Sequence, residues 1–174
     1  LQFSYVPAPK SIYEDIFKLE PASYVEFDCK NILSRKFTIK KYWDLNKIAS
    51  GYSSTVTNDD NTALSNVKDA LKESIKLQMV SDVPLGSFLS GGIDSSLITA
   101  LMQEQSMQKV KTFTIGFEES LYDESPYARD VAEHLGTDHS EYIVTPHEAM
   151  DVINDLPFIY DEPFADSSQI PTHL

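Results

Sequence analysis

The residues best suited to chemistry lie in one eight-residue stretch, LSGGIDSS, at positions 89–96. Its adjacent glycines, Gly91 and Gly92, let the backbone pass close to a ligand because they carry no Cβ. The hydroxyl groups on both sides can donate hydrogen bonds to anionic oxygens. If a helix begins at Asp94 or Ser95, its free N–H groups and the positive end of its dipole also favour a phosphate. The stretch therefore predicts a loop that binds a phosphate or pyrophosphate group.

Other functional loops match this stretch less well. Residues 86–92 have the glycine spacing of a P-loop, but Gly92 stands where that loop requires lysine. A dinucleotide loop requires G-x-G-x-x-G and a hydrolase elbow requires G-x-S-x-G, and the sequence has neither. For a glycine pair alone, the alternative is an ordinary strand-to-helix turn with Asp94 or Ser95 at the N-cap position.

The elements around the loop have the length and order of a βαβ unit. An apolar run over residues 83–89 predicts a strand, residues 97–105 predict a helix, and residues 110–117 predict a second strand. Strands joined in this way are parallel, with a right-handed crossover. Ligands of parallel sheets bind beyond the carboxyl ends of the strands, where both the glycine loop and residues 116–124 are expected.

The same alternation continues downstream. Ser125 and Pro126 predict the start of a helix and Gly136 its end, and residues 139–144 predict a third strand. The TPHE sequence at residues 145–148 predicts a capping box that opens another helix. The pattern indicates an α/β domain with a doubly wound parallel sheet.

The N-terminal part of the chain differs in character. Residues 1–45 are rich in proline and aromatic side chains, and they predict a short helix over residues 11–19 and strands near residues 23–28 and 35–40. These pieces are too few to bury a core. We therefore expect a small β-rich remnant of a larger N-terminal domain.

A change in composition marks the expected domain boundary. Residues 46–61 are rich in serine, threonine, asparagine and aspartate and are expected to be a linker. Residues 62–174 are the predicted α/β domain, which begins with a helix whose apolar face runs from Leu64 to Ile75. A helical pattern has only begun where the chain stops at Leu174, so we expect a piece of a longer protein.

The charge of the chain restricts its partners. With 27 acidic and 14 basic residues, the 174-residue chain has a formal net charge of −13. Nucleic acid is not expected as a partner, because its phosphates are bound by clustered lysine and arginine. A bound nucleotide would depend on backbone amides, a divalent cation and a few placed cations.

The cysteine content and hydropathy indicate a compartment. The only cysteine, Cys29, cannot form a disulfide within the chain and is typical of a reducing environment. The sequence shows no signal peptide, no long apolar span and no metal-site spacing among its four histidines. We therefore expect a cytoplasmic protein without membrane contact.

A second group of candidate residues lies near the end of the chain. These acidic and hydroxyl side chains are expected in another loop, and the alternative is a solvated helix start capped by one of them. They are Asp161, Glu162, Asp166, Ser167 and Ser168.

Residues 81–96, SDVPLGSFLSGGIDSS, resemble the signature of the asparagine synthetase family, whose glycine loop is the pyrophosphate loop of the N-type ATP pyrophosphatases. The resemblance covers nearly the whole chain. Residues 5–45 are similar to the end of the family's glutamine amidotransferase domain, and residues 62–174 to the first half of its synthetase domain. It implies an adenine nucleotide alpha hydrolase-like fold and a cytoplasmic ligase, and it allows a homodimer of the full-length protein.

The resemblance also implies a reaction and a site. ATP would adenylate the β-carboxylate of aspartate and release pyrophosphate, and ammonia from glutamine would then displace AMP. ATP and Mg²⁺ are the implied cofactors; Asp94 would help place Mg²⁺ and Asp123 would pair with the α-ammonium group of aspartate, so both are assigned to catalysis. The residues assigned to ATP are Leu89, Ser90, Gly91, Gly92, Ile93, Asp94, Ser95, Ser96, Ile115 and Gly116. The residues assigned to the amino-acid substrate are Asp123, Asp161, Glu162, Ser167 and Ser168.

The sequence departs from the family in two places. It begins with Leu1 instead of the nucleophilic cysteine of the glutaminase, and Cys29 lies in the wrong context to replace it. It also lacks the Ser-Gly-x-Gly-x-Asp-Glu motif, and the lysine beyond it, that complete the family's ATP site. We therefore expect no glutamine hydrolysis, and weak nucleotide binding with little turnover from this chain alone.

Three alternatives stay open at this point. A related amidotransferase could adenylate a different carboxylate, with altered loops near Asp123 and Asp166. A non-catalytic module could bind ATP without releasing pyrophosphate. A serine hydrolase could use Ser90 or Ser95, but neither an elbow nor an ordered triad accompanies these serines.

Overall fold

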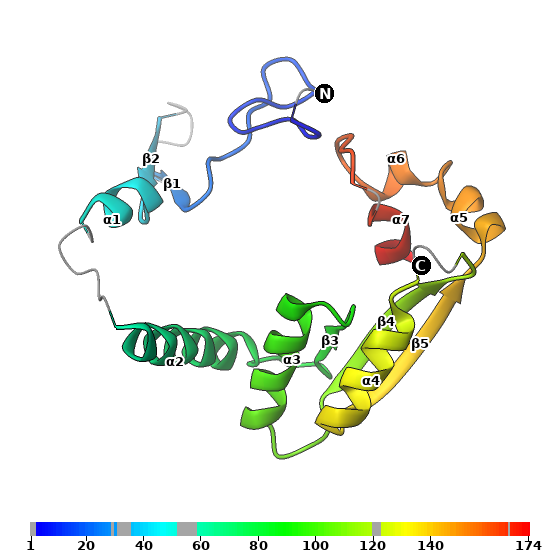
Figure 1. The fold of residues 1–174 in the computed structure, drawn as a ribbon. Helices are drawn as coiled ribbons and strands as arrows, with labels where there is room; N and C mark the ends of the chain where they lie inside the picture. The colour runs from blue at the N-terminus through cyan, green and yellow to red at the C-terminus, as the bar shows by residue number, and fades with distance from the viewer. Residues whose placement is uncertain (1–2, 29, 31–35, 52–58, 120–122, 167) are drawn as a thin grey trace. The chain divides into compact units, whose positions relative to one another are not determined.

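The computed structural model describes residues 3–28, 30, 36–51, 59–119, 123–166 and 168–174. The chain forms two compact units. The first comprises Leu1–Val56 and Asp155–Ser168, and the second comprises Thr57–Asn154 and Gln169–Leu174. The chain therefore leaves the second unit after residue 154 and returns to it at residue 169 (Figure 1).

The second unit contains a three-stranded parallel sheet. Its strands are β3 (Gly86–Phe88), β4 (Lys111–Phe117) and β5 (Asp138–Val144), in the spatial order β3-β4-β5. The first residues of the three strands pair with one another, so the strands begin level. The predicted α/β class and parallel strands are confirmed. A doubly wound sheet requires helices on both faces and stays a prediction.

Helices connect these strands. α3 (Ile93–Gln105) joins β3 to β4, and α4 (Ser125–Leu135) joins β4 to β5. The two helices contact each other, and α4 also contacts β4 and β5 (Figure 1). Gly136 ends α4 in the left-handed conformation, with φ at 70°, as the sequence predicts.

The helix after β5 begins with the predicted capping box. The N–H of Glu148 donates to Thr145 Oγ1 at 3.2 Å, and the N–H of Thr145 donates to the Glu148 carboxylate at 2.9 Å. This pair opens α5 (Pro146–Val152), which contacts α7 (Gln169–His173).

A small apolar cluster joins α2 (Asp60–Gln78) to α3. Ile75 of α2 packs with Leu101 and Met102 of α3 and with Val110, which precedes β4. The apolar face predicted for α2 is used only at its C-terminal end. Leu64 is 69% exposed, whereas Ile75 is 7% exposed.

The first unit contains an antiparallel hairpin of β1 (Ser23–Phe27) and β2 (Phe37–Lys41), together with α1 (Leu45–Gly51) and α6 (Leu156–Ile159). The two predicted strands are confirmed. Their identity as the remnant of a larger domain stays a prediction. Among the helices of the described ranges, none is long and apolar enough to cross a membrane.

The helix predicted over residues 11–19 is absent, and turns stand in its place. The Ser11 hydroxyl accepts the N–H of Tyr13 at 3.0 Å and donates to the carbonyl of Ile16 at 2.7 Å. A serine side chain that binds nearby backbone groups offers them an alternative to helical hydrogen bonds. The segment is therefore ordered by its own turns.

The division into units differs from the predicted domains in two respects. α1 occupies part of the linker expected over residues 46–61, and α2 begins at its other end, with Asp59 as N-cap; residues 52–58 lie outside the described ranges. Residues 155–168, expected in the α/β domain, group with the first unit instead.

We predict that Leu101→Ala lowers the free energy of unfolding of the second unit by about 2–5 kcal/mol, because it opens a cavity in a packed cluster. Leu101 is 4% exposed. Leu64→Ala is the control, because it removes the same atoms from an exposed position of α2. Urea unfolding followed by circular dichroism measures both changes, and equal losses would contradict the observed packing.

Candidate active site

The predicted phosphate loop joins β3 directly to α3. β3 ends at Phe88, and α3 begins at Ile93 with Gly92 as its N-cap residue. Gly92 has no side chain, and the structure shows no side-chain cap on this helix among the residues it describes. The N–H groups of the first turn are therefore available to an anion, and the helix dipole adds partial positive charge there.

Gly91 is the position where the loop requires glycine. Its φ of 79° is in the left-handed region, and a Cβ would lie 2.6 Å from the backbone nitrogen of Ala128 and 2.6 Å from Tyr127 Cβ. Gly92 has an ordinary φ of −70°, and a Cβ there would meet only Ser90 Oγ, at 3.3 Å. The loop therefore packs closely against the first turns of α4 at Gly91.

Two serines hold the shape of the loop. Ser95 Oγ accepts the N–H of Ser90 at 3.2 Å and lies 2.9 Å from Ser90 Oγ. Ser90 Oγ accepts the N–H of Gly92 at 3.3 Å, and Ser95 Oγ also lies 3.3 Å from the Gly92 carbonyl, to which it can donate. Both hydroxyls are half-buried and already bonded, so they position the backbone amides and can rotate toward a ligand.

The other predicted residues of this stretch have different surroundings. Ile93 is 87% exposed, whereas Leu89 is 2% exposed and packs with Ala128 and Ala132 of α4. The N–H of Leu89 donates to the Phe113 carbonyl at 2.9 Å, and its own carbonyl accepts the Thr114 hydroxyl. Leu89 therefore anchors the base of the loop.

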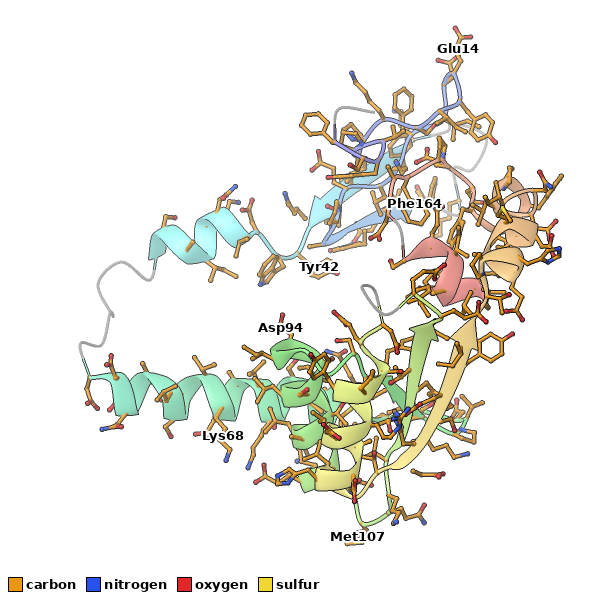
Figure 2. All side chains as sticks on the ribbon, turned by 45° about the vertical axis from the view of Figure 1, so that its right-hand side comes forward. Glu14, Tyr42, Lys68, Asp94, Met107 and Phe164 are labelled. Atoms are coloured by element: carbon orange, nitrogen blue, oxygen red, sulfur yellow. The ribbon has the colours of Figure 1, made fainter. Side chains whose placement is uncertain are left out.

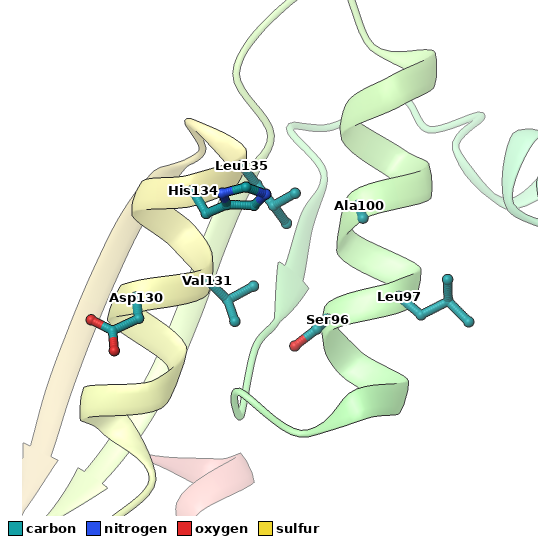
Figure 3. A pocket seen from close by; sticks show the side chains of 7 residues that line it. All are labelled: Ser96, Leu97, Ala100, Asp130, Val131, His134 and Leu135. Atoms are coloured by element: carbon teal, nitrogen blue, oxygen red, sulfur yellow. The ribbon is translucent and has the colours of Figure 1, made fainter.

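Ser96 points away from the loop. Figure 3 shows its side chain directed from α3 toward α4, beside Val131. It lines a cavity of about 480 Å³ between the two helices. Its hydroxyl is buried and has no hydrogen-bond partner in the described part of the chain. The N–H of Ser96 donates to the Gly92 carbonyl at 3.1 Å, so neither its hydroxyl nor its N–H is free to face the loop. The assignment of Ser96 to phosphate binding stays a prediction.

Asp94 lies in the first turn of α3 and is exposed, at the end of the helix that carries the loop (Figure 2). The described residues contain no group of three or more acidic, histidine or cysteine side chains that could hold a metal ion by themselves. Mg²⁺ commonly binds one or two carboxylates together with substrate phosphates. A single exposed carboxylate beside a phosphate loop fits a cation that arrives with a nucleotide.

Another part of the predicted site lies at the carboxyl end of β4. Ile115 is half-buried and lines a cavity of about 470 Å³ with Phe113, Tyr142 and residues of α7. Gly116 is buried, and a Cβ there would lie 2.9 Å from the Asp123 carboxylate. The absence of a side chain at Gly116 therefore allows Asp123 to approach the strand end.

Asp123 precedes α4 and is held by its first turn. Its carboxylate accepts the N–H of Ser125 at 3.1 Å and the N–H of Phe117 at 3.4 Å. The Ser125 hydroxyl, followed by these N–H groups, holds the pKa of Asp123 below its ordinary value. Because Gly91 also contacts the start of α4, the phosphate loop and Asp123 are brought to the same edge of the sheet.

The residues of the acidic stretch belong to the first unit. Asp161 is exposed, and Ser167 lies outside the described residues. Asp166 accepts the N–H of Ser168 at 2.9 Å and its hydroxyl at 2.8 Å, which lowers the pKa of Asp166. Glu162 is engaged by Lys18 and by the N–H of Ile12.

Buried hydroxyl groups under the loop were missed at the sequence level. Ser87 Oγ lies 3.1 Å from Thr99 Oγ1, which ties β3 to α3. Thr114 binds the Leu89 carbonyl from the neighbouring strand. The alternation of threonines at positions 112 and 114 in the TFTIGF strand is the signal that could have placed them on the helix-facing side.

We predict that Gly91→Ala destabilises the second unit by about 2–4 kcal/mol, through backbone strain and overlap with α4. Gly92→Ala is the matched control and should lower the free energy of unfolding by less than about 1 kcal/mol. The φ of Gly92 is ordinary, and the nearest atom, Ser90 Oγ, can move. Urea unfolding of the two variants compares the effects. Similar losses would contradict the contact with Ala128.

We predict that Ser125→Ala raises the pKa of Asp123 toward its ordinary value, because the hydroxyl is the main group that stabilises the carboxylate. A depressed folded-state pKa stabilises the fold above the unfolded-state pKa, and this contribution is lost as the pH falls through the folded value. Carboxyl-carbon NMR titration measures the change. Ser168→Ala, which removes the hydroxyl beside Asp166, should leave Asp123 unchanged.

Comparison with known proteins assigns the chain to a family. The family profile described as asparagine synthase matches residues 66–174. A protein assigned as glutamine-hydrolysing asparagine synthetase 2 in Methanocaldococcus jannaschii is 38% identical over 97% of this chain and 31% of its own length. Glutamine-hydrolysing asparagine synthetase 1 of Bacillus subtilis is 32% identical over 100% of this chain and 26% of its own length. The chain thus spans less than a third of these relatives, and it belongs to the asparagine synthase family.

Proposed function

We propose that this chain is part of an ATP-dependent ligase that makes asparagine from aspartate. A carboxylate oxygen of the aspartate side chain attacks the α-phosphorus of ATP, and the bond to the β-phosphate oxygen breaks with release of pyrophosphate. Ammonia derived from glutamine then attacks the activated carbonyl carbon, AMP leaves with the bonding electrons, and the amide nitrogen loses a proton. The names of the relatives favour aspartate over another carboxylate.

The observation that carries the proposal is the glycine loop. Gly91 is held against α4 with a positive φ, and α3 begins directly behind it without a side-chain cap in the described residues. Ser90 and Ser95 hold the backbone between them. Preorganised N–H groups at a helix start stabilise charge that develops on a leaving pyrophosphate, without reorganisation during the reaction.

The remaining roles follow from position in the fold. Asp94 would bind Mg²⁺, which supplies charge neutralisation of the phosphates when bound. Ile115 and Gly116, at the carboxyl end of β4, would border the adenosine. Asp123, with its lowered pKa, stays anionic and would pair with the α-ammonium group of aspartate. By their match to the family motif, we assign Asp161, Ser167 and Ser168 to recognition of the amino-acid substrate.

The test is calorimetric titration of MgATP into this chain, alone and joined to a downstream segment with the Ser-Gly-x-Gly-x-Asp-Glu motif. Pyrophosphate release with aspartate and ammonia is then assayed. We predict that the extended chain binds more tightly and releases pyrophosphate only with aspartate. Binding without release would support a non-catalytic nucleotide module instead. Release with another carboxylate would support a related amidotransferase.

We predict that Asp94→Asn in the extended chain weakens MgATP binding on the order of tenfold, because it removes a carboxylate ligand of the cation. Binding of ATP measured with excess EDTA should change little. Asp82→Asn removes the same charge from an exposed position before β3 and should leave both affinities unchanged. Equal effects of the two substitutions would exclude a specific role for Asp94.

A further inference from the structure

The side chain of Glu162 has a donor for each of its carboxylate oxygens. Oε1 accepts the N–H of Ile12 at 3.1 Å, and Oε2 forms an ion pair with Lys18 Nζ. Lys18 Nζ also donates to the carbonyl of Val6. The side chains of Glu162 and Lys18 are only 20% and 35% exposed, so the pair is partly shielded from water.

A second contact holds the same segment three residues after Glu162. The N–H of Ala165 donates to the carbonyl of Ser4 at 2.6 Å. The rings of Tyr160 and Phe164, two residues before and two residues after Glu162, pack edge to face with their centroids 4.8 Å apart. Residues 160–165 are therefore held to the N-terminal segment through both backbone and side-chain bonds.

The N-terminal segment is itself preorganised to present Lys18. The N–H of Lys18 donates to the Pro9 carbonyl at 2.9 Å, and the N–H of Lys10 donates to the Pro7 carbonyl at 3.1 Å. Ser11 bridges the residues between them. Less conformational freedom is lost when such a fixed segment binds a partner.

The pair differs from an ordinary surface ion pair in the same unit. Lys40 and Glu26 lie 2.7 Å apart on neighbouring strands of the hairpin, with side chains 48% and 51% exposed. Exposed ion pairs of this kind contribute little to the free energy of folding. Residues 155–168 carry four carboxylates and no lysine or arginine. The cation that pairs with Glu162 is Lys18, which lies 144 residues earlier in the sequence.

We propose that Lys18 and Glu162 form a latch through which the N-terminal segment positions the loop of residues 160–166. Lys18 lies before the stretch matched by the family profile, and the loop lies inside it. The latch therefore couples the two parts of the chain. Lys18 is a positioning residue, because it holds the loop through its ion pair with Glu162. The Glu162 carboxylate is used in this pair and does not contact the substrate. The role of the loop in substrate recognition rests on the proposed function, whereas the latch does not.

The latch is tested by hydrogen exchange on the 174-residue chain. In Lys18→Met, exchange at Ile12 and Ala165 should accelerate together, on the order of tenfold, because both amides depend on the same docked arrangement. Lys18→Arg keeps the charge and should restore most of the protection. Glu162→Gln keeps an acceptor for the N–H of Ile12 but removes the ion pair. In the double variant with Lys18→Met, it should therefore accelerate exchange little beyond the rate of Lys18→Met alone.

Lys40→Met is the matched control, because it removes a lysine from the exposed pair of the same unit. It should leave the exchange of Ile12 and Ala165 at the unmodified rates. Acceleration at Ile12 without Ala165 in Lys18→Met would overturn the latch. Equal acceleration in Lys40→Met, or failure of Lys18→Arg to restore protection, would do the same.

A second measurement separates the latch from the proposed function. In the extended chain, Lys18→Met should raise the KM for aspartate several-fold while the KM for ATP stays unchanged, because only the substrate loop is loosened. An unchanged KM for aspartate would overturn positioning by the latch. Absence of any aspartate-dependent reaction in the unmodified extended chain would overturn the proposed function, and the exchange experiment would still decide the latch.

Discussion

The contact between Gly91 and the first turns of α4 is the constraint on which the functional edge of the second unit depends. Only a residue without a Cβ fits there, because that atom would lie 2.6 Å from the backbone of Ala128. Leu89 is buried against Ala128 and Ala132 two residues earlier. The end of β3, the glycine loop and α4 are therefore packed as one piece, and the first turn of α3 takes its orientation from that packing.

The proposed anion site in the loop has no cation of its own. Residues 89–96 contain no lysine or arginine, and the whole chain carries a net charge of −13. Serine hydroxyls therefore bond to one another and to the backbone, and they leave the peptide dipoles at the start of α3 to face the ligand. This arrangement suits a ligand that brings a divalent cation with it, and the exposed Asp94 stands where such a cation would be met.

Three carboxylates of the chain have very different surroundings. Asp94 is exposed at a helix start. Asp123 is held by N–H groups and a hydroxyl, which lower its pKa and order the start of α4. Glu162 has both oxygens engaged by the N-terminal segment. These surroundings underlie the roles proposed for them, a metal ligand for Asp94, a partner of the substrate ammonium group for Asp123, and a coupling between distant parts of the chain for Glu162.

The sequence by itself determined most of the strands and helices of the second unit and where the glycine loop lies between them. The glycine pair, the capping box at Thr145 and the end of α4 at Gly136 depend on short-range backbone preferences, which are legible in a few adjacent residues. Only the tertiary structure decided which way the side chain of Ser96 points and that Glu162 is held by Lys18. These depend on packing and on contacts between residues far apart in the chain, for which local spacing contains no information.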